Sequence, residues 1–209
     1  MGRYLEKGAF FPDTNNVGEY RITELIGRGS SCAVYLADFT DYEGNVTEHI
    51  LKEYNPTSLH TVRSSDGKLV VREDECEEFE NGLLRFREGY KRQLAIRRMS
   101  ELKNSTINVQ KIFEANGTNY IDMTVFNGIV YSRLEEESLY QLLRRMKALT
   151  QVIGSYHRSG FLHLDIKPDN IFAIPETSEL VMLFDFDSVA EKEKMSSMGG
   201  LSYTKDWAA

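Results

Sequence analysis

The sequence predicts an α+β fold with a strand-rich front half and a helical back half. Three observations lead to this prediction: short apolar runs separated by turn residues from residue 20 to 125, a helical spacing of apolar residues over 73–99, and a second such spacing over 138–159. Strands followed by helices are typical of α+β proteins. Of the 209 residues, 41% are hydrophobic, so the chain has enough apolar material for a core.

The first three strands are predicted at 20–26, 33–37 and 49–52, paired as an antiparallel meander. Each is a short run rich in apolar residues, and a glycine cluster and the turn-like segment 41–45 separate them. Residues 55–72 contain a proline and a Ser-Asp-Gly turn signal. We therefore expect an irregular insert or a small extra hairpin there.

A long helix is predicted from Glu73 to about Met99. Its first turns are acidic and its last turns are basic, which suits a helix because acids oppose the positive N-terminal end of the dipole and bases the negative C-terminal end. Its apolar residues keep a helical stripe, formed by Phe79, Leu83, Phe86, Tyr90 and Leu94.

A hairpin and a second helix are predicted next. Strands at 109–115 and 118–125 flank Asn116-Gly117, and Asn-Gly between apolar runs is a strong hairpin signal. From Ser138 to about Gly160, apolar residues recur every three or four positions, which predicts an amphipathic helix. Its stripe consists of Leu139, Leu142, Leu143, Met146, Leu149, Ile153 and Tyr156.

Charge and cysteine content narrow the classes of function. Lys and Arg number 25 against 32 Asp and Glu, a formal net charge of −7, which argues against bulk nucleic-acid binding because that binding relies on a basic surface. Two cysteines, Cys32 and Cys76, are too few for a disulfide framework. No apolar run approaches the roughly 20 residues of a membrane span, and the N-terminus lacks a signal-peptide core. We therefore expect a reduced, cytoplasmic protein without a nucleic-acid partner and without a membrane segment in this chain.

Two weak signals for phosphate binding lie in the front half. Residues 27–34, Gly-Arg-Gly-Ser-Ser-Cys-Ala-Val, join two predicted strands, and glycines there let backbone N–H groups approach a phosphate chain closely. Lys52 ends a predicted strand, where its ammonium group could pair with phosphate oxygens. Taken alone, both features also fit ordinary structure, namely a glycine-containing hairpin turn and a solvated lysine.

The decisive segment is 163–170, His-Leu-Asp-Ile-Lys-Pro-Asp-Asn, followed after a further predicted strand pair by 185–187, Asp-Phe-Asp. These two segments resemble the catalytic loop and the metal-binding Asp-Phe-Gly motif of eukaryotic-like (Hanks-type) serine/threonine protein kinases. The glycine-rich loop 27–34 and Lys52 precede them in the order of that family, so the resemblance covers residues 20–209. The Lys-Pro pair favours serine/threonine kinases over tyrosine kinases and small-molecule kinases.

The resemblance implies a bilobal kinase fold, in which an antiparallel-sheet N-lobe with one main helix precedes a partial helical C-lobe. Residues 1–19 would form an N-terminal extension, 20–123 the N-lobe, 124–128 the hinge and 129–209 the partial C-lobe. Such a protein would transfer the γ-phosphoryl group of ATP to Ser or Thr hydroxyl groups of protein substrates.

The resemblance also implies a role for each matching residue. Asp165 would orient the substrate hydroxyl and accept its proton, Lys167 would neutralise the transferring phosphoryl group, and Lys52 would contact the α- and β-phosphates. Asn170 and Asp185 would hold Mg²⁺, because their oxygen ligands suit a hard cation. The remaining nucleotide contacts, with a gatekeeper methionine among them, would be Gly27, Gly29, Val34, Ile50, Met123, Thr124, Val125 and Phe126.

Several positions depart from the kinase pattern. Leu164 replaces the arginine that normally gathers a phosphorylated activation loop, and Asp187 replaces the glycine of Asp-Phe-Gly. The helix partner of Lys52 is open between Glu88 and Gln93. A glutamine would turn the usual ion pair into a neutral hydrogen bond.

The C-terminal residues 202–209 resemble the end of an activation segment, after which the family continues with further helices. The resemblance thus implies a truncated kinase domain that is weakly active or inactive, with apolar groups exposed in the catalytic loop 163–170 and in the segment 185–209. We expect such a chain to self-associate through that segment. Two alternatives stay open, a nucleotide-binding pseudokinase or scaffold and a small-molecule kinase.

Overall fold

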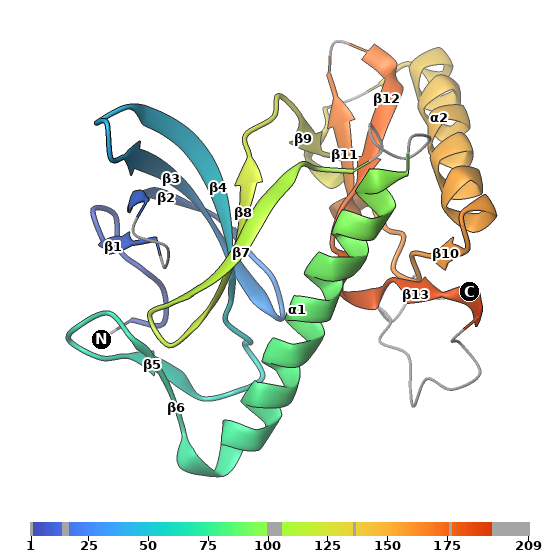
Figure 1. Ribbon diagram of the computed structural model, residues 1–209. Coiled ribbons are helices and arrows are strands. Elements are labelled where there is room, and N and C mark those ends of the chain that lie inside the picture. Colours follow the sequence, from blue (N-terminus) through green and yellow to red (C-terminus); the bar gives the residue numbers. More distant parts are fainter. Residues whose placement is uncertain (1, 14–16, 100–105, 136, 176, 194–209) are drawn as a thin grey trace. The chain divides into compact units, whose positions relative to one another are not determined.

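The structure is a computed structural model that describes residues 2–13, 17–99, 106–135, 137–175 and 177–193. The chain divides into two compact units (Figure 1). The first consists of Met1–Arg87 and Val109–Val125, and the second of Glu88–Asn108 and Phe126–Ala209. No helix among the described residues is long and apolar enough to cross a membrane.

A six-stranded antiparallel sheet forms the frame of the first unit. Its strands lie in the order β1-β2-β3-β4-β8-β7. The sheet confirms the predicted meander and adds β1, which the sequence did not indicate. The bounds are β1 Phe10–Pro12, β2 Gly18–Arg28, β3 Cys32–Asp41, β4 Val46–Tyr54, β7 Val109–Ala115 and β8 Thr118–Thr124.

The predicted Asn-Gly turn joins β7 to β8. Asn116 has a φ of 50° and Gly117 a φ of 71°. A two-residue hairpin turn with positive φ at both positions matches the twist of the strands that it joins, and few residues other than Asn and Gly accept it. The local sequence alone therefore determined this turn.

The core of the first unit is rich in aromatic rings. Tyr20 stacks on Phe113 with ring centroids 5.1 Å apart, and Phe113 stacks on Tyr120 at 5.4 Å. Leu5, which precedes the sheet, and Phe11 of β1 are buried in the same cluster. These two N-terminal side chains are therefore part of this unit's core.

Residues 55–72 form the small hairpin that was one of the two expectations for this insert. Strand β5, Thr61–Arg63, pairs with β6, Leu69–Val71. A short 3₁₀ turn, Glu73–Glu75, then leads into helix α1, Cys76–Arg98 (Figure 1). The helix confirms the prediction for 73–99.

Helix α1 packs closely against Tyr54 in the first unit. Phe79, Leu83 and Phe86 of the predicted stripe are buried. A Cβ atom on Gly82 would overlap the hydroxyl oxygen of Tyr54. The absence of a side chain at this position therefore allows the helix to approach the end of β4.

We predict that Gly82→Ala destabilises the chain although alanine is the better helix former. The methyl group would force apart a packed contact, a change that typically costs about 1–3 kcal/mol. Gly154→Ala is the matched control, because its Cβ would meet only the flexible end of Arg158, at 3.3 Å, and should stabilise a helix interior by up to about 1 kcal/mol. Thermal unfolding followed by circular dichroism should show opposite shifts, and equal shifts would contradict the packing argument.

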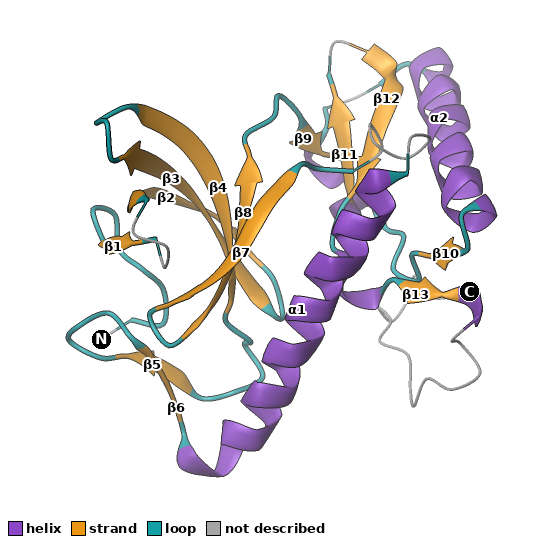
Figure 2. Ribbon diagram, viewed as in Figure 1, coloured by secondary structure: helices purple, strands orange, loops and turns teal. Residues whose placement is uncertain are grey.

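The second unit combines helix α2, Leu139–Arg158, with short strands. Strands β9, β11 and β12 form one sheet, and β10 pairs with β13; Figure 2 shows β11 and β12 beside α2. Ser138 begins α2 with a reciprocal capping box to Gln141. The bounds are β9 Ile129–Val130, β10 Phe161–Leu162, β11 Ile171–Ile174, β12 Thr177–Leu183 and β13 Ala190–Glu191, with 3₁₀ turns Tyr131–Arg133, Pro168–Asn170 and Phe186–Ser188.

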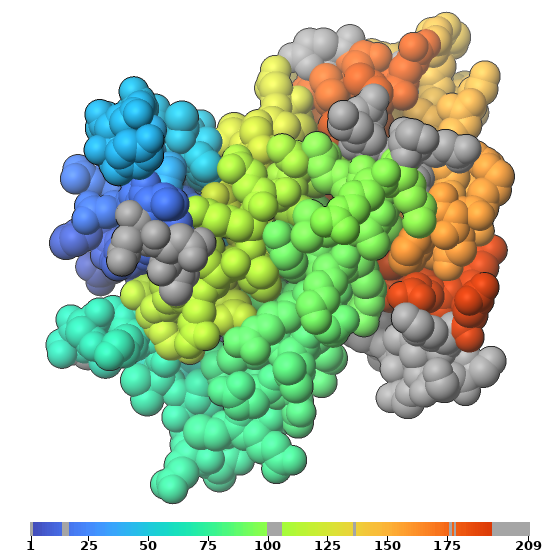
Figure 3. Space-filling view, viewed as in Figure 1, coloured from blue at the N-terminus to red at the C-terminus, as the bar shows by residue number. Residues whose placement is uncertain are grey.

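The apolar stripe predicted along α2 is only half buried. Its C-terminal half, with Leu149 and Tyr156, packs into the core of the second unit. Its N-terminal half faces outward: Leu139 is 70% exposed and Leu143 60% exposed. Figure 3 shows α2, gold to orange, at the outer surface of this unit. Helical spacing predicted an apolar face correctly but could not tell which part of that face would be covered.

Candidate active site

The glycine-rich loop connects β2 to β3 as a tight turn. Gly27 pairs with Val34 across the ladder, and a Cβ on Gly27 would lie 3.3 Å from the Val34 Cβ. The Gly29 N–H donates to the Cys32 carbonyl at 2.8 Å. Cys32 itself is buried, so its thiol is a packed side chain of the loop's end.

Lys52 lies in the middle of the sheet, two residues before the end of β4. It pairs with Val34 on β3 and with Ile121 on β8. Its ammonium nitrogen lies 5.7 Å from the centroid of the Phe86 ring on α1. The predicted phosphate-binding lysine and the loop residue Val34 are therefore direct neighbours across one strand pair.

The predicted gatekeeper lies on the same part of the sheet. Met123 on β8 pairs with Ile50 on β4 and is buried. Thr124 ends β8, and Val125 is the last residue of the first unit. Phe126 belongs to the second unit, where its ring meets Phe172 edge-on with centroids 4.6 Å apart.

The structure places the two candidate helix partners of Lys52 differently. Glu88 is exposed, and its carboxylate accepts a hydrogen bond from Lys91 at 2.7 Å. Gln93 is buried, and its Nε2 donates to the Ile107 carbonyl at 3.2 Å. The helix partner of Lys52 stays a prediction.

Asp165, Lys167 and Asn170 meet in one loop of the second unit. The Oδ2 atom of Asp165 accepts hydrogen bonds from Lys167 Nζ at 2.9 Å and from Asn170 Nδ2 at 2.7 Å. Asn170 Nδ2 also donates to the Asp165 carbonyl at 2.9 Å. A carboxylate that accepts these bonds on one oxygen is fixed in direction, as a base that must meet a substrate hydroxyl has to be.

The β11–β12 hairpin brings Asn170 and Asp185 to one edge of the sheet. Its register pairs Ile171 with Leu183, so the residues just outside this pair lie at the same end. The backbone N–H of Phe184 donates to the Asn170 carbonyl at 3.1 Å. Two residues separated by 15 positions in the sequence thus become neighbours through a short antiparallel pair.

Two residues of this site have left-handed backbone conformations. Leu164 has a φ of 64°, and Asp185 has a φ of 63° and a ψ of 75°. Such conformations are unfavourable for residues with a Cβ and persist only where the surroundings impose them. His163, which precedes Leu164, donates from Nε2 to the carbonyl of Phe184 at 2.9 Å. That hydrogen bond joins the two strained positions.

Asn170 and Asp185 form a donor set that fits Mg²⁺. Both hydrogen bonds of the Asn170 side chain use its nitrogen, so the amide oxygen remains available as a ligand. A carboxylate and an amide oxygen are hard ligands, and Mg²⁺ is usually held by one or two such groups together with substrate phosphates. In the part of the chain that the structure describes, no group of three or more His, Cys, Asp and Glu side chains gathers as an all-protein metal site.

Asp187, where the kinase pattern has glycine, lies beside α1. Its Oδ1 is 2.9 Å from the position that a Cβ on Gly89 would occupy. The glycine in the helix thus makes room for the aspartate. Gly89 in the helix and Asp187 in the loop are therefore linked by packing, which the sequence alone did not reveal.

The positioning role of His163 was also missed in the sequence, although it opens the catalytic motif. His163 is buried, and its Nδ1 has no hydrogen-bond partner among the described residues. Burial lowers the pKa of this imidazole, although the Phe184 carbonyl and nearby carboxylates act in the opposite direction. We therefore assign the neutral form with the proton on Nε2.

We predict that this histidine makes stability depend on pH. Since its pKa is lower in the folded protein than the ordinary value of 6.5, the unfolded chain binds an extra proton in acid. The free energy of unfolding should therefore fall as pH drops from about 7 to 5. His163→Gln keeps an N–H donor and should weaken that fall, whereas His157→Gln, at an exposed position on α2, should follow the wild type. If urea unfolding gave the same pH dependence of the free energy of unfolding in all three proteins, this assignment would be contradicted.

The structure also bears on the expectation of an exposed segment after Asp185. Phe186, Val189 and Ala190 are buried, so the described part of that segment is well covered, contrary to the expectation. Residues 194–209, with the resemblance to the end of an activation segment, lie outside the described residues.

Comparison with known proteins finds similarity to serine/threonine protein kinases. No protein-family model matches the chain. The chain is 25% identical over 187 residues to the serine/threonine-protein kinase PknE of Mycobacterium bovis, a match of 87% of this chain and 28% of PknE. A stretch of 100 residues, 46% of the chain, is 26% identical to the smooth-muscle myosin light chain kinase of Gallus gallus, of which it covers 5%. The chain thus spans about a quarter of the length of PknE.

Solved structures show the same fold. The apo form of PpkA-294 superposes with a TM-score of 0.69 and 28% sequence identity, covering 88% of this chain and 62% of that one. The kinase domain of PF14_0431 gives a TM-score of 0.67 at 12% identity, covering 97% of this chain and 58% of that one. The predicted fold class, a sheet-rich N-lobe with a partial C-lobe, is confirmed.

Proposed function

From the homology of this chain to Hanks-type serine/threonine protein kinases, we propose that it transfers the γ-phosphoryl group of ATP to Ser or Thr hydroxyl groups of proteins. The observation that carries the proposal is the loop in which Lys167 and Asn170 both hydrogen-bond to Asp165. Phosphoryl transfer needs positioning and charge neutralisation more than covalent chemistry. A fixed carboxylate beside an ammonium group and an amide supplies both.

In this proposal each residue has one task. Asp165 orients the substrate hydroxyl and takes its proton, and Lys167 neutralises the transferring phosphoryl group. Lys52 contacts the α- and β-phosphates. The glycine-rich loop covers the phosphates, and Ile50, Val34 and the segment 123–126 contact the adenosine.

The proposal includes Mg²⁺ held by Asn170 and Asp185. When bound, the ion would supply charge neutralisation at the phosphates. The left-handed backbone of Asp185 and the hydrogen bond from His163 to the adjacent Phe184 carbonyl support this role, because they fix the backbone of Asp185 at the same sheet edge as Asn170. We also propose a cytoplasmic location, which rests on two cysteines that are both free.

We predict that Asp185→Asn abolishes Mg²⁺-dependent transfer and that Asp165→Asn lowers kcat by about 10²- to 10⁴-fold, the usual contribution of a general base. ATP affinity should change little in Asp165→Asn, because that residue acts on the substrate hydroxyl. The matched control is Asp169→Asn, since Asp169 is exposed in the same loop and accepts a hydrogen bond from Ser132 at 2.6 Å. It should retain most of the activity in a radiolabel transfer assay.

The same assay separates the alternatives. Undiminished transfer in Asp165→Asn or Asp185→Asn would overturn the catalytic assignment. Metal-dependent ATP binding without transfer would indicate a pseudokinase or scaffold. Transfer to small alcohols but not to protein would indicate a small-molecule kinase.

We also propose that the 209-residue chain self-associates through α2 and not through the segment after Asp185. Leu139, Tyr140, Leu143 and Met146 form an exposed apolar patch on its first turns, and exposed apolar patches favour association. Replacing Leu139 and Leu143 by Ser should shift sedimentation toward the monomer. A wild-type chain that sediments as a monomer at all concentrations would contradict this proposal.

A further inference from the structure

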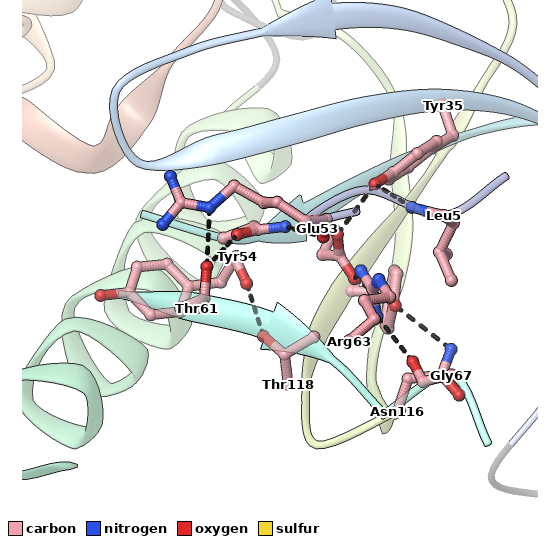
Figure 4. Close-up of polar contacts among 12 residues, drawn as sticks. Leu5, Tyr35, Glu53, Tyr54, Thr61, Arg63, Gly67, Asn116 and Thr118 are labelled. Carbon is pink, nitrogen blue, oxygen red and sulfur yellow. Dashed lines mark hydrogen bonds and ion pairs between the residues drawn. The ribbon is translucent and has the colours of Figure 1, made fainter. Parts of the chain in front are cut away.

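The carboxylate of Glu53, the residue after Lys52, is completely buried on the opposite face of the sheet. It accepts hydrogen bonds from the hydroxyl of Tyr35 at 3.0 Å, from Asn55 Nδ2 at 3.2 Å and from the Tyr120 hydroxyl, and it forms an ion pair with Arg63. Figure 4 shows Glu53 between Tyr35 and Arg63. A buried charge persists only when such partners surround it.

The ion pair fastens the β5–β6 hairpin to the sheet. Arg63 is almost fully buried and also donates to the Gly67 carbonyl at 2.9 Å, within its own hairpin. Burial opposes the charged form of Arg63, but the Glu53 carboxylate outweighs it and raises the arginine pKa above its ordinary value. The arginine therefore stays charged at all ordinary pH values.

Asn55 extends this network to the N-terminal residues 2–13, which we call the N-terminal segment. Asn55 Nδ2 also donates to the Arg3 carbonyl at 3.2 Å, and its Oδ1 accepts from the Thr61 hydroxyl at 3.1 Å. Arg3 Nε donates to the same Thr61 hydroxyl oxygen at 2.7 Å. The Leu5 N–H donates to the Tyr35 hydroxyl at 3.2 Å (Figure 4).

Asn55 and Thr57 hydrogen-bond to the tip of the glycine-rich loop. The backbone N–H of Asn55 donates to the Ser31 carbonyl at 3.0 Å. Thr57 donates twice to the Ser30 carbonyl, from its N–H at 2.7 Å and from its hydroxyl at 3.0 Å. The Arg28 guanidinium lies 4.9 Å from the centroid of the Tyr4 ring in the N-terminal segment. The loop is thus held at its tip and at its side by elements outside the loop.

We propose that the N-terminal segment, acting through Asn55, and Thr57 together clamp the glycine-rich loop in position for nucleotide. Arg3 and Thr57 are positioning residues in this view, and their role in ATP binding rests on the proposed function. The physical reason is entropic. Ordering a flexible loop when the nucleotide binds costs conformational entropy, and a loop that is already held in place does not incur this cost.

The first test uses the whole 209-residue chain without nucleotide. Arg3→Ala removes the side-chain bonds to Thr61 and to the Leu59 carbonyl, and Thr57→Val removes one hydroxyl donor at an exposed site while keeping the side-chain shape. Hydrogen exchange read by mass spectrometry should become several-fold faster in the peptides covering 27–34 and 55–57 and stay unchanged in α2. Lys7→Ala removes an exposed positive charge from the same segment and is the matched control.

The second test measures ATP. Arg3→Ala and Thr57→Val should raise the Kd and KM for ATP by about 3- to 10-fold, the size expected for the loss of one hydrogen bond or two, while kcat changes little. A general loss of stability would lower kcat and the melting temperature as well, so this split separates positioning from unfolding. Thr57→Ser, which keeps the hydroxyl, should restore the wild-type values.

The outcomes are distinct. Loop exchange in Arg3→Ala equal to that in Lys7→Ala would overturn the clamp. Faster loop exchange with unchanged ATP affinity would overturn its role in positioning nucleotide. If the wild-type chain bound no ATP, the proposed function would fail, and the exchange comparison would still decide whether the N-terminal segment holds the loop.

Discussion

The first unit is organised around the buried carboxylate of Glu53. A charge without solvent must find its partners within the protein, and the partners of Glu53 come from strands β3 and β8 and from the insert 55–72. Those partners bring the N-terminal segment and the tip of the glycine-rich loop into the same network. Lys52, the adjacent residue, points to the other face of the strand because side chains alternate. The chemistry on one face is therefore supported by the network on the other.

In the second unit, buried polar groups around a short loop likewise find their hydrogen-bond partners within the protein. Asp165, Asn170 and His163 are all buried. Asn170 donates to Asp165 within the loop, whereas the His163 side chain and the Asn170 carbonyl bond to the backbone of Phe184, after β12. Unmade hydrogen bonds in such a place would be costly, so the loop and the Asp185 segment hold one another in place. This mutual restraint explains how two residues keep left-handed backbones without glycine.

Local sequence determined the features that depend on neighbours in the chain. The Asn116-Gly117 turn, the helix over 73–99 and the motif at 163–170 were all predictable, because each has a short-range physical or chemical signature. Strand β1 gave no signal in the sequence, since its three residues include a proline and do not alternate between apolar and polar types.

Other features depend on residues far apart in the sequence. Nothing near Glu53 indicates that it would be buried, since its partners Arg63 and Tyr120 stand 10 and 67 positions away. The spacing along α2 likewise predicts an apolar face but not what covers it, and Leu139 and Leu143 are exposed. Burial is a property of the assembled fold, so single-sequence patterns could not supply it.

The proposed binding of ATP and Mg²⁺ by this chain is tested most directly by thermal unfolding with ATP. With ATP and Mg²⁺ together the melting temperature should rise, since a ligand at a hundredfold excess over its Kd stabilises the folded state by about 2.7 kcal/mol. ATP with a chelator should give a smaller rise, and Asp185→Asn should lose the metal-dependent part. An unchanged melting temperature in saturating ATP and Mg²⁺ would contradict the account.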